Sequence, residues 1–238
     1  MRFLCLSDIH GHADALSAVL ATAERTGYTR VLVAGDICFP GPAPLSTWRR
    51  LNQLQARCVQ GVGDRAIATV DTSTFRPRDD FERARLRRLV DVRRELGDAI
   101  LGQLAKLPRL LRQALPGGRQ LTLVHGSPVD PLEPLTHDMD DETMAHLLGD
   151  EVADIVLCGG SHVPFDRLVP HARGGITRVI NVGSVGEAPA SSAAYAHGPR
   201  GEVAAWRGGR GHAHATFIEA TNDGIDVQQF VVPLGRAA

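Results

Sequence analysis

The stretch that decides the fold reads Arg-Phe-Leu-Cys-Leu-Ser-Asp-Ile-His-Gly, from residue 2 to residue 11. Its first part, Arg2–Ser7, is mostly apolar and predicts a buried β-strand at the start of the chain. Asp8 and His10 follow at once, so an acid and an imidazole stand where that strand ends. Because ligands of open α/β sheets bind outside the carboxyl ends of the strands, this stretch predicts a binding site as well as a strand.

The same pattern, an apolar run followed by a polar side chain, recurs along the chain. The further pairs are Val31–Ala34 with Asp36, Arg57–Gln60 with Asp64, Gln120–Val124 with His125, and Ile155–Cys158 with His162. Acids and imidazoles buried together are costly unless a cation compensates them, and mixed Asp/His ligation suits Mn, Fe, Zn or a similar ion. Each residue alone is as easily a helix cap or a hydrogen-bonded surface group, but their succession at five strand ends favours a metal site.

Between these runs the apolar residues recur at helical spacing, which predicts an α/β architecture. The expected helices lie around 16–23, 45–51, 86–96 and 100–107, and from Asp140 or Asp141 to Leu148. Gly97-Asp98 is expected to end one helix and begin the next, and Gly61–Arg65 is expected to form a turn. Arg178–Asn181 predicts another strand.

A single domain is expected over residues 1–238. Residues 188–211 are rich in Ala, Gly and Ser and predict a mobile loop. The Asn222-Asp223-Gly224 sequence predicts a C-terminal hairpin at 215–233.

Composition narrows the class of protein. The 238 residues are 43% hydrophobic and 22% charged, with a net charge of -1, which is typical of a globular protein with no global attraction to nucleic acid or anionic membranes. No apolar run is long enough to span a bilayer. Four cysteines without CxxC spacing predict free thiols and a cytoplasmic location.

An arginine-rich stretch at 76–95 also holds five acids and lacks interleaved aromatic residues, so we interpret it as a solvated helix face. The oligomeric state is left open.

In this order the motifs resemble those of the calcineurin-like metallophosphoesterases, and they are closest to the small, stand-alone prokaryotic phosphodiesterases. The matching segments are Asp8-Ile9-His10-Gly11, Gly35-Asp36, Gly61-x-x-Asp64, His125-Gly126, Gly159-x-x-His162 and Asn181-x-Gly183-Ser184. The similarity runs from about Arg2 to Glu187. It implies two packed, mainly mixed β-sheets flanked by helices, and hydrolysis of a phosphorylated small molecule or nucleotide.

The resemblance also implies roles for individual residues. The first metal would be held by four residues: Asp8, His10, Asp36 and His162. Asp36 would bridge to a second ion that also takes His125, and Asp36, His125 and Asp64 are the expected catalytic residues. The cofactor would be one or two divalent ions, with manganese, iron, zinc or nickel as candidates.

Two positions depart from the family pattern, and both concern the second ion. Val62 stands where the family supplies an asparagine ligand, and Gly160 stands where it supplies a histidine. His12 replaces a usual asparagine and is expected to face solvent at the start of a helix. Two functions stay open: a phosphoesterase with an intact first site and a depleted second one, or a catalytically impaired member that binds phosphate or nucleotides as a regulatory module.

Overall fold

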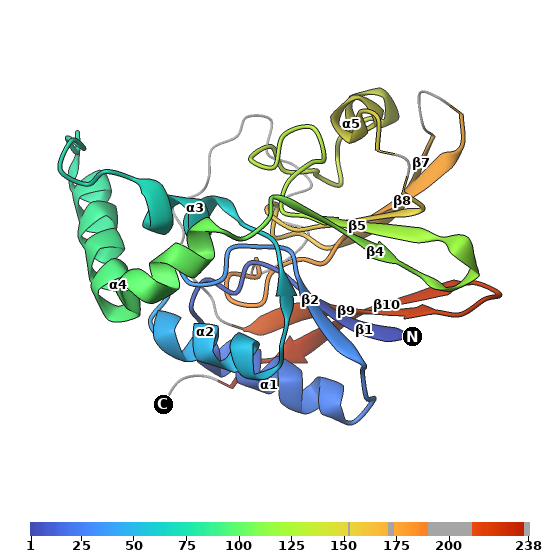
Figure 1. The fold of residues 1–238 in the computed structure, drawn as a ribbon, viewed down its shortest axis with the longest axis horizontal. Helices are drawn as coiled ribbons and strands as arrows, with labels where there is room; N and C mark the ends of the chain where they lie inside the picture. Colours follow the sequence, from blue (N-terminus) through green and yellow to red (C-terminus); the bar gives the residue numbers. More distant parts are fainter. Residues whose placement is uncertain (152, 171–173, 190–210, 236–238) are drawn as a thin grey trace.

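The computed structural model of the chain (Figure 1) describes residues 1–151, 153–170, 174–189 and 211–235. Most of the loop expected at 188–211 therefore lies outside the described residues. The described residues form two five-stranded sheets that pack face to face, with helices on the outer face of each. This arrangement confirms the predicted architecture of two mixed sheets flanked by helices.

The first sheet has the strand order β10-β9-β1-β2-β3. Its strands are β1 (Arg2–Leu6), β2 (Arg30–Val33), β3 (Arg57–Cys58), β9 (His212–Ala220) and β10 (Ile225–Pro233). The pairs β1–β2 and β2–β3 are parallel, whereas β9 and β10 pair antiparallel with each other and β9 pairs antiparallel with β1. The three parallel strands therefore end at the same edge of the sheet.

The second sheet has the order β4-β5-β6-β8-β7. Its strands are β4 (Leu110–Ala114), β5 (Gln120–Val124), β6 (Ile155–Cys158), β7 (Phe165–Pro170) and β8 (Ile176–Asn181). The central strands β5, β6 and β8 are parallel, and the edge strands β4 and β7 are antiparallel. Neither edge strand was predicted, because their residues alternate between partly buried and exposed positions and carry arginines rather than a continuous apolar run.

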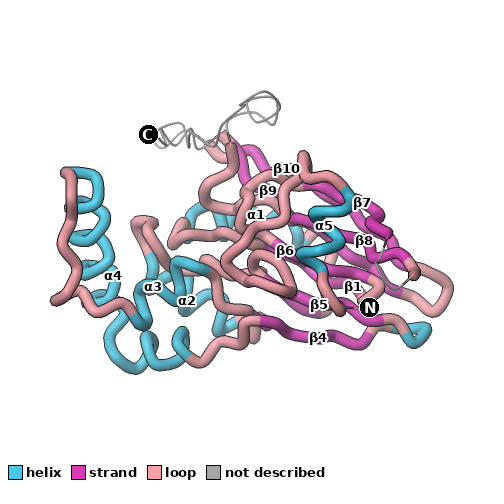
Figure 2. Tube along the Cα trace, turned by 90° about the horizontal axis from the view of Figure 1, so that it is seen from above, coloured by secondary structure: helices cyan, strands magenta, loops and turns pink. Residues whose placement is uncertain are grey.

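The helices are α1 (Ala13–Glu24), α2 (Pro44–Gln53), α3 (Val62–Thr69), α4 (Asp80–Ala105) and α5 (Asp141–Leu148), with a short 3-10 turn at Pro116–Gly118. In Figure 1, α1 and α2 cover the first sheet and α5 covers the second, while Figure 2 shows α4 extending from one end of the molecule. Asp140 caps α5 by accepting a hydrogen bond from Thr143 N at 2.7 Å. Gly97 has a non-helical conformation inside α4, which confirms the predicted break. Among the described residues, no helix has the length and apolar character needed to cross a bilayer.

The side chains of β1 point alternately to the two faces of the sheet and so reach both packed cores. Phe3 and Cys5 face the core between the sheets, and Leu4 and Leu6 face the core beneath the helices. All four side chains are fully buried, so the strand has no face free to move without disturbing a packed layer. The residues that follow β1 are consequently held in a fixed position.

Two sequence predictions about local structure were wrong. Gly61–Arg65 is the start of α3 rather than an isolated turn, because Asp64 accepts a hydrogen bond from Gly61 N at 3.1 Å and stabilises the first helical turn. His12 does not face solvent. It precedes α1 and is only 3% exposed.

Candidate metal centre

The carboxyl ends of the parallel strands of both sheets meet at one place. Asp8 and His10 follow β1, Asp36 follows β2, His125 follows β5 and His162 follows β6. Backbone hydrogen bonds join these segments: Asp8 N donates to Gly35 O at 3.1 Å and His10 N donates to Asp36 O at 2.9 Å. The structure thus brings together all five of the residues that the sequence nominated as metal ligands.

The backbone at this place is strained. Asp8, His10, Asp36 and His162 adopt positive φ angles of 53°, 51°, 53° and 63°. Apart from Gln55, these are the only non-glycine residues with positive φ in the described chain. This conformation costs roughly 1–2 kcal/mol per residue and persists where the surrounding structure enforces it, most often at functional sites.

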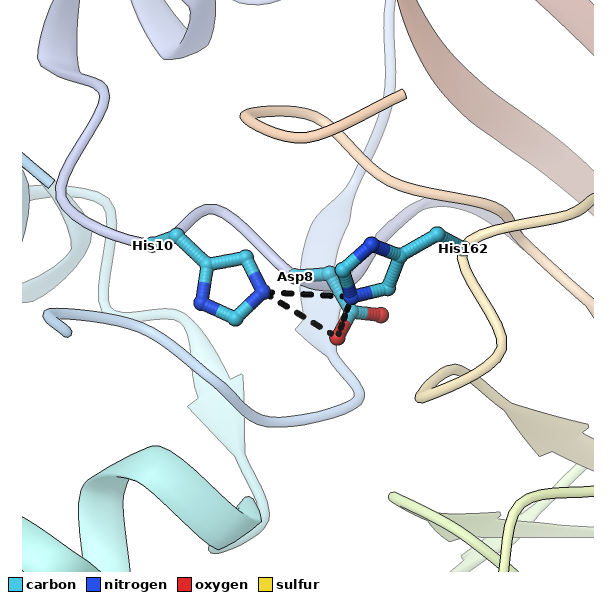
Figure 3. A group of neighbouring side chains, drawn as sticks. All are labelled: Asp8, His10 and His162. Carbon is cyan, nitrogen blue, oxygen red and sulfur yellow. Dashed lines mark hydrogen bonds and ion pairs between the residues drawn. The ribbon is translucent and has the colours of Figure 1, made fainter. Parts of the chain in front are cut away.

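Asp8, His10 and His162 form the first group (Figure 3). Asp8 Oδ1 lies 3.2 Å from His162 Nε2 and 3.7 Å from His10 Nε2, and the two Nε2 atoms are 3.2 Å apart. Ligand atoms bound at about 2.1 Å to one ion are separated by roughly 3 to 4 Å, and all three distances fall in this range.

The second group contains Asp8, Asp36 and His125. His125 Nε2 lies 3.7 Å from Asp36 Oδ2, and the same oxygen is 4.0 Å from His10 Nε2. Asp8 belongs to both groups, and Asp36, which the resemblance makes the bridging carboxylate, is a member of the second group that also approaches His10 of the first.

Hydrogen bonds to backbone carbonyls set the tautomers of two histidines. His10 Nδ1 lies 2.5 Å from Phe39 O, and His125 Nδ1 lies 2.7 Å from Ala34 O. Since a carbonyl oxygen only accepts, Nδ1 carries the proton in the neutral ring and Nε2 presents its lone pair to the cluster. This is the orientation in which imidazoles ligate metals.

Asp8 provides the sharpest test of whether a cation fits. Its side chain is completely buried, and Oδ2 accepts a hydrogen bond from Gly160 N at 2.9 Å. Oδ1 accepts no hydrogen bond from the described residues, although it faces the imidazoles of His10 and His162. A buried carboxylate oxygen that accepts no hydrogen bond needs a positive charge beside it, and a divalent cation among these nitrogen and oxygen atoms would supply one. The donor set therefore fits a divalent metal.

The electrostatics of the cluster agree with its geometry. Burial alone would raise the pKa of Asp8, but the imidazoles of His162, His125 and His10 outweigh it and lower that pKa. Burial lowers the pKa of His162, and the carboxylates of Asp8, Glu187 and Asp36 outweigh it and raise the pKa to about 9. Without a metal, Asp8 and His162 therefore form an ion pair at neutral pH, and a bound cation would displace the proton on His162.

Asp64, expected among the catalytic residues, lies behind the cluster. It is fully buried, and its two oxygens accept hydrogen bonds from Ile37 N at 2.9 Å and Gly61 N at 3.1 Å. Burial and the nearby Asp36 raise its pKa to about 6 despite these bonds. Its two oxygens thus bind the backbone of Ile37, which follows Asp36, and of Gly61, which begins α3.

The two departures from the family pattern have clear structural counterparts. Val62 is 44% exposed at the start of α3 and offers no ligand atom. A side chain at Gly160 would begin 3.5 Å from His125 Nε2, so that position does face the second group, but glycine leaves it empty of donors. The neighbouring Gly63 contributes through its backbone, with N donating to Asp36 Oδ1 at 2.7 Å.

The arginine-rich helix α4 contacts the loop at residues 39–41, next to the cluster. Arg88 donates hydrogen bonds to Pro40 O and Gly41 O, and the guanidinium of Arg85 lies 5.1 Å from the centre of the Phe39 ring. Phe39 O in turn orients His10. The interpretation of this stretch as a solvated helix face holds for most of its arginines, but these two fix the loop behind a predicted ligand.

Sequence reasoning missed one residue of the cluster. Glu187 Oε2 lies 3.5 Å from His10 Nε2, and its side chain is only 10% exposed. It follows the Asn181-x-Gly183-Ser184 turn, which was recognised, but nothing in the local pattern distinguished Glu187 from an ordinary surface acid.

Comparison with known proteins agrees with this geometry. The family model for the calcineurin-like phosphoesterase superfamily domain matches residues 1–198. An uncharacterised protein of Methanocaldococcus jannaschii is 24% identical over 162 residues, which cover 67% of this chain and 62% of that protein, so less than two thirds of the relative is matched.

Two solved structures share the fold. A hypothetical protein of Pyrococcus horikoshii superposes with a TM-score of 0.74 at 20% identity, covering 99% of this chain and 89% of its own. A metallophosphoesterase of Sphaerobacter thermophilus gives a TM-score of 0.65 at 21% identity, covering 97% and 88%. At these identities the two structures establish the fold alone.

Proposed function

Because the chain belongs to the calcineurin-like phosphoesterase superfamily, we propose that it is a metal-dependent phosphoesterase with a complete first metal site and a depleted second one. The observation that carries this proposal is the buried Asp8 Oδ1, which accepts no hydrogen bond and faces Nε2 of both His10 and His162. A divalent ion at such a site polarises a phosphoryl oxygen and lowers the pKa of bound water. Asp8, His10, Asp36 and His162 would hold this ion.

The remaining residues of the cluster have supporting roles in the proposal. His125, with Nε2 3.7 Å from Asp36 Oδ2, assists a weakly held second ion or contacts the phosphoryl group directly. Asp64 and Gly63 fix the loop and the carboxylate of Asp36 through their hydrogen bonds. Asp64 is thus proposed as a positioning residue, in place of the catalytic role expected from the sequence.

A cationic cavity beside the cluster suits a phosphorylated substrate. Arg65 and Arg109, together with a single acid, Asp130, line a cavity of about 40 Å³ that also borders Gly61. A side chain at Gly61 would begin 2.2 Å from Asp36 Oδ1, so the cavity adjoins the metal ligands. Neither guanidinium forms an ion pair with a described residue, which leaves both able to contact a phosphate oxygen of a phosphoester or nucleotide.

Hydrolysis of bis-nitrophenyl and mono-nitrophenyl phosphate, with Mn²⁺ or Ni²⁺ added, tests the proposal. Metal-stimulated release of nitrophenol that is lost in Asp36→Asn is the expected result. The absence of metal-stimulated turnover on both substrates would overturn the assignment as a hydrolase.

The depleted second side favours one alternative, a module that binds phosphate or nucleotides without hydrolysing them. Val62 and Gly160 are the observation behind it, since neither supplies a ligand atom. This alternative predicts that phosphate or a nucleotide raises the melting temperature of the metal-loaded protein while no product accumulates.

A further inference from the structure

Glu187 brings a third carboxylate to the first side of the cluster. Its Oε2 atom lies 3.5 Å from His10 Nε2, closer than the oxygens of Asp8 at 3.7 Å and Asp36 at 4.0 Å. The Glu187 side chain is as buried as that of Asp36, with 10% and 11% exposed. Three acids therefore surround one imidazole nitrogen in a largely buried place.

The turn that carries Glu187 is fastened to the segment that carries Asp8. Ser184 Oγ accepts a hydrogen bond from Glu187 N at 2.7 Å and donates one to Asp8 O at 2.8 Å. Gly186 N also donates to Asp8 O, at 3.0 Å. A side chain at Gly186 would begin 2.2 Å from Ile9 O, so this close approach requires glycine. Glu187 is thus held at a fixed position relative to Asp8 by backbone contacts.

While the imidazole of His10 is neutral, no hydrogen bond explains its contact with Glu187. His10 places its Nδ1 proton on Phe39 O, so Nε2 presents a lone pair toward the Glu187 carboxylate. A lone pair and a carboxylate at 3.5 Å repel each other unless a positive charge lies close to both. The separation of 3.5 Å is also the one expected for two neighbouring ligands of a single ion with bonds of about 2.1 Å.

We propose that Glu187 is an additional protein ligand of the first metal ion, reached directly or through one bound water. With it the first side has five protein ligands, while the second side lacks donors at Val62 and Gly160. The centre is thereby built to hold one ion firmly. This inference rests on the metal site of the proposed function, but not on hydrolysis.

Glu187→Gln tests the inference, because it keeps the shape of the side chain and removes its charge. Calorimetric titration of the full chain with Mn²⁺ is expected to show an affinity roughly 10- to 100-fold weaker than that of the wild type. Glu142→Gln, an exposed acid on α5, is the matched control and should bind like the wild type. The metal-free variant should still unfold cooperatively, and added Mn²⁺ should raise its melting temperature by less than it raises that of the wild type.

Two results would overturn the role of Glu187: an affinity of Glu187→Gln for Mn²⁺ that matches the wild type, or a rise of its melting temperature on addition of Mn²⁺ that matches the wild type. A wild-type protein that binds no Mn²⁺ would overturn it together with the proposed function. Binding that depends on Glu187 without any phosphoesterase turnover would support the ligand role and refute hydrolysis alone. Turnover combined with unchanged affinity in the variant would refute the ligand role alone.

Discussion

The two sides of the candidate metal centre are unequal although Asp8 belongs to both groups of possible ligands. On the first side, nitrogen and oxygen atoms of Asp8, His10 and His162 lie 3.2–3.7 Å apart, and Glu187 adds a further carboxylate. On the second side, His125 faces Asp36 at 3.7 Å, and the positions of two expected donors are Val62 and Gly160. The difference teaches that the backbone frame and the donor set are separate features, because strand ends and backbone hydrogen bonds make the frame while individual side chains supply the donors.

The largest effect is expected from the first side. Asp8→Asn removes the buried charge that faces two imidazoles, so affinity for Mn²⁺ should fall by more than the roughly 10- to 100-fold typical of lost outer-shell partners. His125→Gln, on the second side, should leave the first ion in place. Calorimetric titration of both variants measures the contrast, and equal losses in the two would contradict the asymmetry.

Restoring donors on the second side should remove the asymmetry. Val62→Asn combined with Gly160→His is expected to raise the metal content from about one to about two ions per chain, and to increase turnover of bis-nitrophenyl phosphate. The positive φ of 74° at Gly160 makes histidine there cost roughly 1–2 kcal/mol of stability, a cost that His162 already bears at φ 63°.

Val129→Asn, at an exposed valine outside the cluster, is the control for the added amide. A double variant that folds and still holds one ion, with unchanged turnover, would show that the missing donors do not cause the difference.

The charge state of His162 makes the first side sensitive to pH. Its pKa in the metal-free protein is raised to about 9, so it must lose a proton to bind metal. Affinity for Mn²⁺ should therefore increase with pH, by at most about tenfold per unit, up to about pH 9. In the metal-free protein, the attraction between charged His162 and its carboxylates adds to the free energy of unfolding. This contribution is complete below about pH 6.5 and is lost as pH rises through 9.

Melting temperatures of the metal-free wild type and His162→Asn, recorded from pH 6 to pH 9.5, measure the second effect. The wild type should become less stable relative to the variant across this window. Parallel curves would show that His162 is not charged beside Asp8.

The smallest effect is expected from substitutions of residues that are not metal ligands. Arg65→Met and Arg109→Met should each raise KM by roughly two- to fivefold with little change in kcat, since exposed ion pairs contribute at most about 1 kcal/mol. Arg87→Met, on an exposed arginine of α4, should leave KM unchanged. Steady-state kinetics decide this, and a fall in kcat at constant KM would place the two arginines elsewhere in the reaction.

The sequence predicted the parts of the molecule in which local pattern and tertiary structure agree. Apolar strands followed by Asp8, Asp36, His125 and His162 located all parallel strands that carry ligands, since burial on both faces gives such strands continuous apolar runs. The edge strands β4 and β7 lack that signal because they are partly exposed.

Other features of the structure depend on contacts between residues that are not neighbours in the sequence. The start of α3 was taken for a turn because Val62-Gly63 is a weak helix signal, and the stabilising bond from Asp64 to Gly61 N appears only in the structure. Glu187 was missed for a similar reason. It reaches His10 because Ser184 and Gly186 bind the backbone at Asp8, which lies far away in the sequence, near the N-terminus.

Elemental analysis of the purified protein, after incubation with Mn²⁺ and removal of free metal, tests the central claim most directly. We expect about one ion per wild-type chain and none in Asp8→Asn. A wild-type protein that retains no metal, or one that retains two ions with equal firmness, would contradict an account in which one complete site lies beside a depleted one.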